Sequence, residues 1–222
     1  MTKLPASMLP QLYAQLMEEV KERLDAVEDQ SQQAQRAIGK PAGYIHCEYA
    51  YLQIRKVIEL IGIAVLLAHN EIDDFRTRDF MKAWNAEALF GRLEKLSNDA
   101  FPEPATEENI DTEKGSADLL IGDSTDTNRR KLKEIYLACS EGLHAGSLSN
   151  LIKSGGKRYD IGKFVEWKNF IVSLLNHHVI LLPDRKSIMI VIMSSLPKGA
   201  VHCRFERLVE NDITFGQKWE PR

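Results

Sequence analysis

The strongest structural signal in this sequence lies in residues 44–70, YIHCEYAYLQIRKVIELIGIAVLLAHN. Apolar residues recur along them at alternating steps of three and four, which is the spacing of one face of an α-helix. The members of this line are Tyr44, Cys47, Tyr51, Ile54, Ile58, Ile61, Val65 and Ala68. From residue 60 to residue 68 every residue is apolar or glycine, so we expect protein to surround this half of the helix. A membrane span needs about 20 such residues, which makes a buried central helix the better prediction.

The composition is that of a globular domain with a sizeable core: 222 residues, 44% hydrophobic and 27% charged. A net charge of −3 gives no general attraction to nucleic acid or acidic membranes. Cys47, Cys139 and Cys203 are far apart and lack a CxxC pair, which argues against a disulfide framework and a cysteine zinc site. Residues 1–16 lack the apolar block of a signal peptide and no other segment is long enough to span a membrane, so we expect a cytoplasmic protein.

Helical spacing predicts further helices over residues 7–36, twice within 73–98, over 128–144, and after Asp160 as N-cap. The apolar stripe of the first helix is Leu9, Leu12, Leu16, Val20, Leu24 and Val27. After Val27 this helix has little to bury, so its end is expected to be solvated or to pack on another chain. Residues 39–43, GKPAG, are expected to separate it from the central helix, and two helices joined so closely usually pack antiparallel.

The remainder of the chain changes character twice. Residues 99–127 contain two prolines, many acids and no period, which predicts an irregular loop; within it, residues 117–121 fit either a short buried strand or one helical turn. After residue 177 the pattern becomes that of β-structure. The expected strands of a three-stranded antiparallel meander, packed on the helices by one face, are residues 179–182, 187–193 and 201–206.

These patterns predict a mainly α fold, in which a multi-helix bundle surrounds the buried helix 44–70. Residues 1–177 would form the bundle, with the loop at about 99–127. Residues 178–210 would form the small β-meander as an appendage of the same domain. We find no internal repeat and no low-complexity segment.

A charged line borders the core of the central helix and is the first candidate site. Glu48, Arg55 and Glu59 lie at i, i+7 and i+11, and Arg55 and Glu59 are spaced to form an ion pair. An arginine beside a core most often anchors a neighbouring helix through bidentate hydrogen bonds. The alternatives are a polar pocket for phosphate binding or acid–base chemistry, and an exposed surface pair.

Tyr136, Ser140 and His144 form a second candidate, because successive i, i+4 steps place them on one side of the helix 128–144. Facing the central helix, they would bring two hydroxyl groups and an imidazole near Arg55 and Glu59. A serine nucleophile also needs activation and an oxyanion hole, and the sequence indicates neither. The alternative is a polar helix end whose groups bond to the backbone.

The sequence lacks the common motifs for cofactors and metals and contains one basic cluster. No phosphate-binding glycine loop, HExxH motif or comparable ligand spacing occurs, so we expect no cofactor and no metal. Four basic residues cluster at a helix start: Arg129, Arg130, Lys131 and Lys133. Positive charge at that position opposes the helix dipole, and a phosphate contact would account for it. Glu48, Arg129, Arg130 and Lys133 are therefore the candidate binding residues.

A long helix with polar residues beside its core, followed by a later helix that ends in histidine, resembles the all-helical HEPN-type domains. These occur in bacterial toxin and antiviral systems, often as ribonucleases. Their signature places a histidine four to six residues after an arginine, but no arginine lies at that distance before His144 or any other histidine here. The resemblance covers the helical architecture of residues 7–177 and implies a non-cleaving member or a different site.

Two functions follow as alternatives. The first is a non-enzymatic helical interaction or regulatory protein of bacterial or phage type, which binds a partner chain or itself, with no membrane partner. The second is a HEPN-like RNA-binding protein or metal-independent ribonuclease that uses Arg55, Glu59, Tyr136 and His144. The absence of a strong catalytic motif favours the first.

Overall fold

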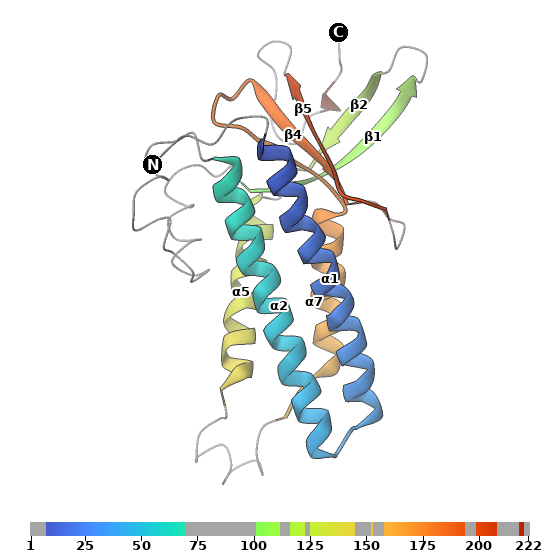
Figure 1. Cartoon of the computed structure of the whole chain (residues 1–222), viewed down its shortest axis with the longest axis vertical. Helices are drawn as coiled ribbons and strands as arrows, with labels where there is room; N and C mark the ends of the chain where they lie inside the picture. The colour runs from blue at the N-terminus through green and yellow to red at the C-terminus, as the bar shows by residue number, and fades with distance from the viewer. Residues whose placement is uncertain are drawn as a thin grey trace.

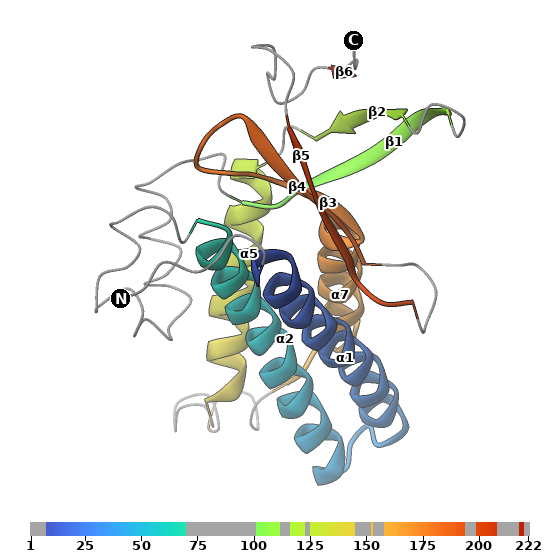
Figure 2. The same ribbon diagram turned by 45° about the horizontal axis from the view of Figure 1, so that its top comes forward.

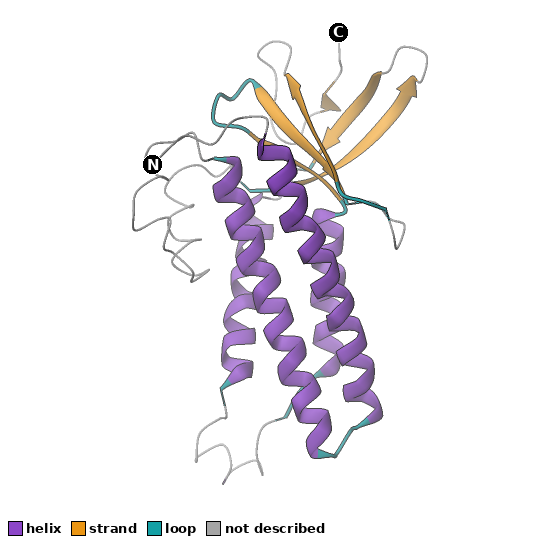
Figure 3. Ribbon diagram, in the orientation of Figure 1, coloured by secondary structure: helices purple, strands orange, loops and turns teal. Residues whose placement is uncertain are grey.

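The computed structural model describes residues 8–69, 101–111, 116–122, 125–144, 152, 158–193, 199–207 and 218–219. Four long helices in this part of the chain stand side by side, and a β-sheet crosses one end of them (Figure 1). Helices and strands occupy separate halves of the molecule (Figure 3). The shorter helices predicted within residues 73–98 lie outside the described residues.

The two longest helices form an antiparallel hairpin. α1 spans Leu9–Arg36 and α2 spans Pro41–Ala68, and they pack along their length. Tyr13 and Met17 are buried in α1 where Leu12 and Leu16 were predicted, and those two leucines are only half-buried. The small residues Ser31 and Ala34 are buried as well, so one side of the end of α1 packs on α2. The exposed side chains at this end are Asp29, Gln32, Gln33, Gln35 and Arg36.

The connection between α1 and α2 is shorter than predicted. Pro41 is the first residue of α2, where its fixed φ suits a helix start and its missing N–H costs nothing. Gly39 takes a φ of +77°, which favours glycine. A Cβ on Gly43 would lie 2.5 Å from the carbonyl oxygen of Ala37, so the tight turn requires glycine there too.

Two shorter helices complete the bundle. α5 spans Thr125–Leu143 and packs on α2, whereas α7 spans Ile161–Leu175 and packs on α1 (Figure 1). Asp160 caps α7 as predicted, since its side chain accepts a hydrogen bond from the N–H of Gly162 at 3.1 Å.

The sheet is larger than the predicted three-stranded meander. It is antiparallel, in the order β5-β4-β3-β1-β2-β6. The strands are β1 (Glu103–Asp111), β2 (Ser116–Ile121), β3 (His177–Leu181), β4 (Ser187–Ile192), β5 (His202–Arg207) and the two-residue β6 (Lys218–Trp219). The predicted meander is β3–β4–β5, whereas β1 and β2 come from the region predicted as an irregular loop. Of the two alternatives for residues 117–121, the strand is correct.

Both faces of the sheet are buried, and not only the face on the helices. Ile180, Met189 and Val191 belong to the same core as the helices. A second apolar cluster lies on the opposite face and consists of Ala105, Leu119, Ile121, Val179, Ile188 and Ile190. In Figure 2, β1 and β2 run at a steep angle to β4 and β5, so the sheet bends over its own face. This bend explains why β4, SIMIVI, is apolar on both sides.

Polar contacts fix the sheet to α1. Glu18 accepts a hydrogen bond from the N–H of Val201 at 2.6 Å, and the ammonium of Lys21 donates to the carbonyl of Gly199, also at 2.6 Å. Lys21 and Glu18 form an ion pair with each other. The segment that enters β5 is thereby held against the first half of α1.

Candidate functional site

Arg55, Glu59 and Tyr136 meet where α2 faces α5. The Nε atom of Arg55 lies 3.2 Å from Oε1 of Glu59, and the Nζ atom of Lys56 lies 2.8 Å from Oε2 of the same carboxylate. The guanidinium carbon of Arg55 lies 5.1 Å from the centre of the Tyr136 ring, at cation–π distance. Tyr136 is buried, so the arginine bridges the two helices by pairing on α2 and stacking on α5.

Glu48 lies apart from this cluster and has its own partner. Tyr159 donates its hydroxyl hydrogen to Oε1 of Glu48 at 2.7 Å. Burial raises the pKa of the Tyr159 phenol, and the bond to Glu48 raises it further. The Tyr159 ring also lies 6.0 Å from the Tyr51 ring at a tilt of 47°, and Tyr51 meets the Phe164 ring edge-on at 4.7 Å. The predicted charged line is therefore two separate contacts, one to α5 and one to the chain just before α7.

Ser140 and His144 continue along α5 beyond Tyr136. The hydroxyl of Ser140 donates to the carbonyl of Tyr136 at 2.9 Å, as serines within helices often do. His144 is exposed just after the end of α5, two turns or about 12 Å along the axis from Tyr136. Gly142 lies against Tyr51, so the last turn of α5 faces the first half of α2 and runs away from Glu59. Tyr136 alone of the three joins the Arg55 cluster through the contacts described.

The basic residues at the start of α5 are partly used in ion pairs. Arg129 bonds to Asp126 at 2.9 Å, and its guanidinium carbon lies 5.8 Å from the centre of the Phe101 ring. Lys131 pairs with Glu166 of α7 at 3.2 Å. Arg130 is exposed and Lys133 is half-buried. Two of the four predicted phosphate contacts thus help to hold α5 in place.

The described ranges hold neither a candidate cluster of metal ligands nor a helix suited to span a membrane. There the His, Cys, Asp and Glu side chains form no group of three or more that could hold a metal ion. No described helix combines the length and the apolar character that crossing a membrane requires. Cys47 and Cys139 are buried, and burial raises the pKa of each thiol.

Sequence reasoning missed a line of exposed apolar residues on α2. Ile45, Tyr49, Leu52 and Ile63 are 65%, 47%, 37% and 42% exposed. Lys56 and Glu59 continue the same line, so that the steps from residue 45 to residue 63 are four, three, four, three and four. We call these six residues the α2 seam. Ile45, Tyr49 and Leu52 lie outside the apolar line predicted for this helix, and Ile63 lies in the run 60–68 that was expected to be surrounded by protein.

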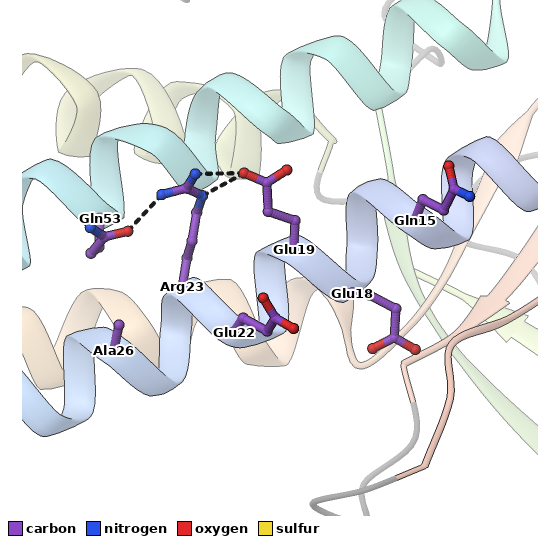
Figure 4. Close-up of a pocket in the computed structure, with 7 residues that line it drawn as sticks. All are labelled: Gln15, Glu18, Glu19, Glu22, Arg23, Ala26 and Gln53. Carbon is purple, nitrogen blue, oxygen red and sulfur yellow. Dashed lines mark hydrogen bonds and ion pairs between the residues drawn. The ribbon is translucent and has the colours of Figure 1, made fainter.

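A shallow groove borders the α2 seam on the side of α1. It has a volume of about 590 Å³ and is lined by Gln15, Glu18, Glu19, Glu22, Arg23, Ala26 and Gln53 (Figure 4). Arg23 reaches across it from α1, donating to the side-chain oxygen of Gln53 on α2 at 2.7 Å and pairing with Glu19. Gln53 lies one helical turn from Tyr49, so the groove forms a polar margin to the exposed apolar line.

Comparisons with protein families, with curated proteins and with solved structures give no match.

Proposed function

We propose that this protein is a non-enzymatic helical interaction module with a regulatory role, and that its docking surface is the α2 seam. The observation that carries this proposal is the line of four large, exposed apolar side chains, Ile45, Tyr49, Leu52 and Ile63, on one side of α2. An exposed apolar line with a polar margin is typical of a surface that binds another protein. Covering these half-exposed side chains would contribute roughly 1 kcal/mol apiece.

The partner that fits this surface is an amphipathic helix. The α2 seam repeats at steps of three and four, which is the pattern by which one helix packs along another. The partner would place apolar side chains against Ile45, Tyr49 and Leu52, and polar ones against the groove beside Gln53.

The polar cluster supports a structural role better than a catalytic one. Ser140 directs its hydroxyl hydrogen to a backbone carbonyl, whereas a nucleophilic serine directs it to a base. Arg55 is occupied by Glu59 and the Tyr136 ring. Such contacts stabilise the packing of α5 on α2 and need no substrate.

Photo-cross-linking tests the proposal. A photoreactive amino acid would replace Leu52 of the α2 seam or, as a control, Val172 of α7, which is similarly exposed at 40%. We expect covalent protein adducts from position 52 and few from position 172, with mass spectrometry identifying the attached chain. Equal yields at the two positions would remove the α2 seam from consideration as a docking surface.

A further inference from the structure

The α2 seam carries opposite charges in a particular order. Leu52 is followed by Lys56, Glu59 and Ile63, so the two charges lie between two apolar residues. Lys56 is half-exposed, and Glu59 is held in place beneath it by Arg55 and by Lys56 itself. From Leu52 to Ile63 the seam therefore reads apolar, positive, negative, apolar, with Glu59 itself only 9% exposed.

This order of residues is complementary to itself in an antiparallel pair of α2 helices. If a second α2 runs antiparallel, with the two-fold axis passing between residues 57 and 58, Lys56 of each copy lies opposite Glu59 of the other. Leu52 then lies opposite Ile63, twice over, because a two-fold interface repeats every contact. Tyr49 comes opposite the half-buried Leu66 in the same register. Lys56 and Glu59 each lie opposite a residue of the other sign, and Tyr49, Leu52 and Ile63 each lie opposite an apolar residue. Ile45 falls opposite residue 70, beyond the end of α2, and lies outside the apolar pairing.

The parallel arrangement fails the same comparison. In register, it would place Lys56 against Lys56 and Glu59 against Glu59 at the centre of the contact. Like charges so close destabilise a pair of helices and discriminate against that pairing. The charge order thus selects one direction for the second helix.

We propose that the α2 seam binds a second copy of this chain, with the two α2 helices antiparallel and the contact centred on Lys56 and Glu59. This inference rests on the proposed function, because it names the partner of the same surface. From residue 49 to residue 66 the paired stretch extends roughly 26 Å, nearly five helical turns. The ammonium of Lys56 would then lie between two carboxylates, its own and that of the other copy.

Cysteine cross-linking distinguishes the two directions. In the antiparallel pair, residue 52 of one copy faces residue 63 of the other, within reach of a disulfide. The two copies of residue 52 are then offset by about 16 Å along the axis, and so are the two copies of residue 63, which is too far for a bond. Oxidation of a mixture of Leu52→Cys and Ile63→Cys should give a covalent dimer, while either variant alone should not.

Wild-type protein is the control for the natural thiols, of which Cys203 is partly exposed and Cys47 and Cys139 are buried. Leu52 and Ile63 are both exposed, so these substitutions leave the core intact. Light scattering of the unmodified protein should report a dimer, which Leu52→Glu should convert to a monomer and Val172→Glu should not.

Three outcomes would overturn the inference. A disulfide within either single variant would indicate a parallel pair, and a mixture that gives no more covalent dimer than wild type would remove the proposed register. A monomer at every concentration would exclude self-association. If that monomer still formed adducts with a different chain from position 52, the proposed function would stand and the second copy alone would be wrong.

Discussion

The hydroxyl of Tyr13 on α1 donates a hydrogen bond of 2.8 Å to Nε2 of His178 on β3, in the fully buried space between the bundle and the sheet. Which atom donates in this bond is decided by the contact of the other ring nitrogen of His178. Nδ1 of His178 lies 2.7 Å from the carbonyl of Leu175, which can only accept, so Nδ1 carries the proton and Nε2 accepts. The bond links the first helix to a strand 165 residues away.

Tyr13→Phe should therefore destabilise the fold, although it removes a single oxygen atom. The change leaves Nε2 of His178 buried without its donor, which costs about 1–3 kcal/mol. The free energy of unfolding in urea measures the effect. Tyr49→Phe is the matched control, because the Tyr49 side chain is nearly half exposed and its variant should unfold like wild type. Equal stability of the two variants would show that the buried bond contributes nothing.

Stability should also fall in mild acid because of His178. Burial, followed by a smaller effect of His177, lowers the pKa of His178 to about 4, against 6.5 for an ordinary histidine. Between these values the unfolded chain binds a proton that the folded chain excludes, so stability is complete above pH 6.5 and declines toward pH 4. The full loss from this group is about 3 kcal/mol. Burial lowers the pKa of His69 as well, which acts in the same direction.

Urea unfolding at pH 7.5, 6.0 and 5.0 measures this slope. His178→Gln should be less stable at pH 7.5 but should lose less on acidification than wild type. His202→Gln, at an exposed position of β5, should keep the wild-type slope. A slope that is unchanged in His178→Gln would assign the acid sensitivity to other groups.

The helices could be predicted because their sequences repeat at helical spacing, whereas half of the sheet could not. β1 reads EPATEENID, with four acids and a proline, and in isolation only Thr106 and Ile110 favour a strand. It becomes a strand because β2 pairs with it on one edge and Val179 and His178 of β3 pair with it on the other. Only the apolar character of β4 on both sides indicated that a second layer had to cover the sheet.

The candidate site was predictable within one helix and only in part between helices: Tyr136 lies near Arg55 as expected, whereas the partner of Glu48 was not predicted. The spacing of Arg55 and Glu59 predicts their ion pair, which the structure contains. That Tyr136 stacks on Arg55, and that Tyr159 binds Glu48, depends on how α5 and the start of α7 are positioned against α2. No spacing along the chain encodes that register. Exposure of the α2 seam depends in the same way on which sides of α2 the other helices leave open.

Gly142→Ala should destabilise the protein, although alanine usually stabilises a helix by about 1 kcal/mol relative to glycine. A Cβ at this position would lie 2.8 Å from the ring atoms of Tyr51. The ring has little room to move, because Phe164 and Trp167 pack against it. Overpacking of this kind costs about 1–3 kcal/mol, so we expect a net loss in thermal or urea unfolding. A variant more stable than wild type would mean that Tyr51 moves freely.

Arg55→Ala separates the structural reading of the polar cluster from the functional one. It removes the stacking on Tyr136 and leaves the mostly buried Glu59 with Lys56 as its remaining ion-pair partner. A loss of about 1–2 kcal/mol would lower the melting temperature by several degrees in a chain of this size. His144→Ala, at the exposed end of α5, should lower it less. Calorimetry of both variants, with an RNA-binding and cleavage assay on the same samples, provides the test. If both variants lost an RNA activity of the wild type while keeping its melting temperature, the cluster would be a nucleic-acid site. Removal of a structural anchor would instead lower the melting temperature.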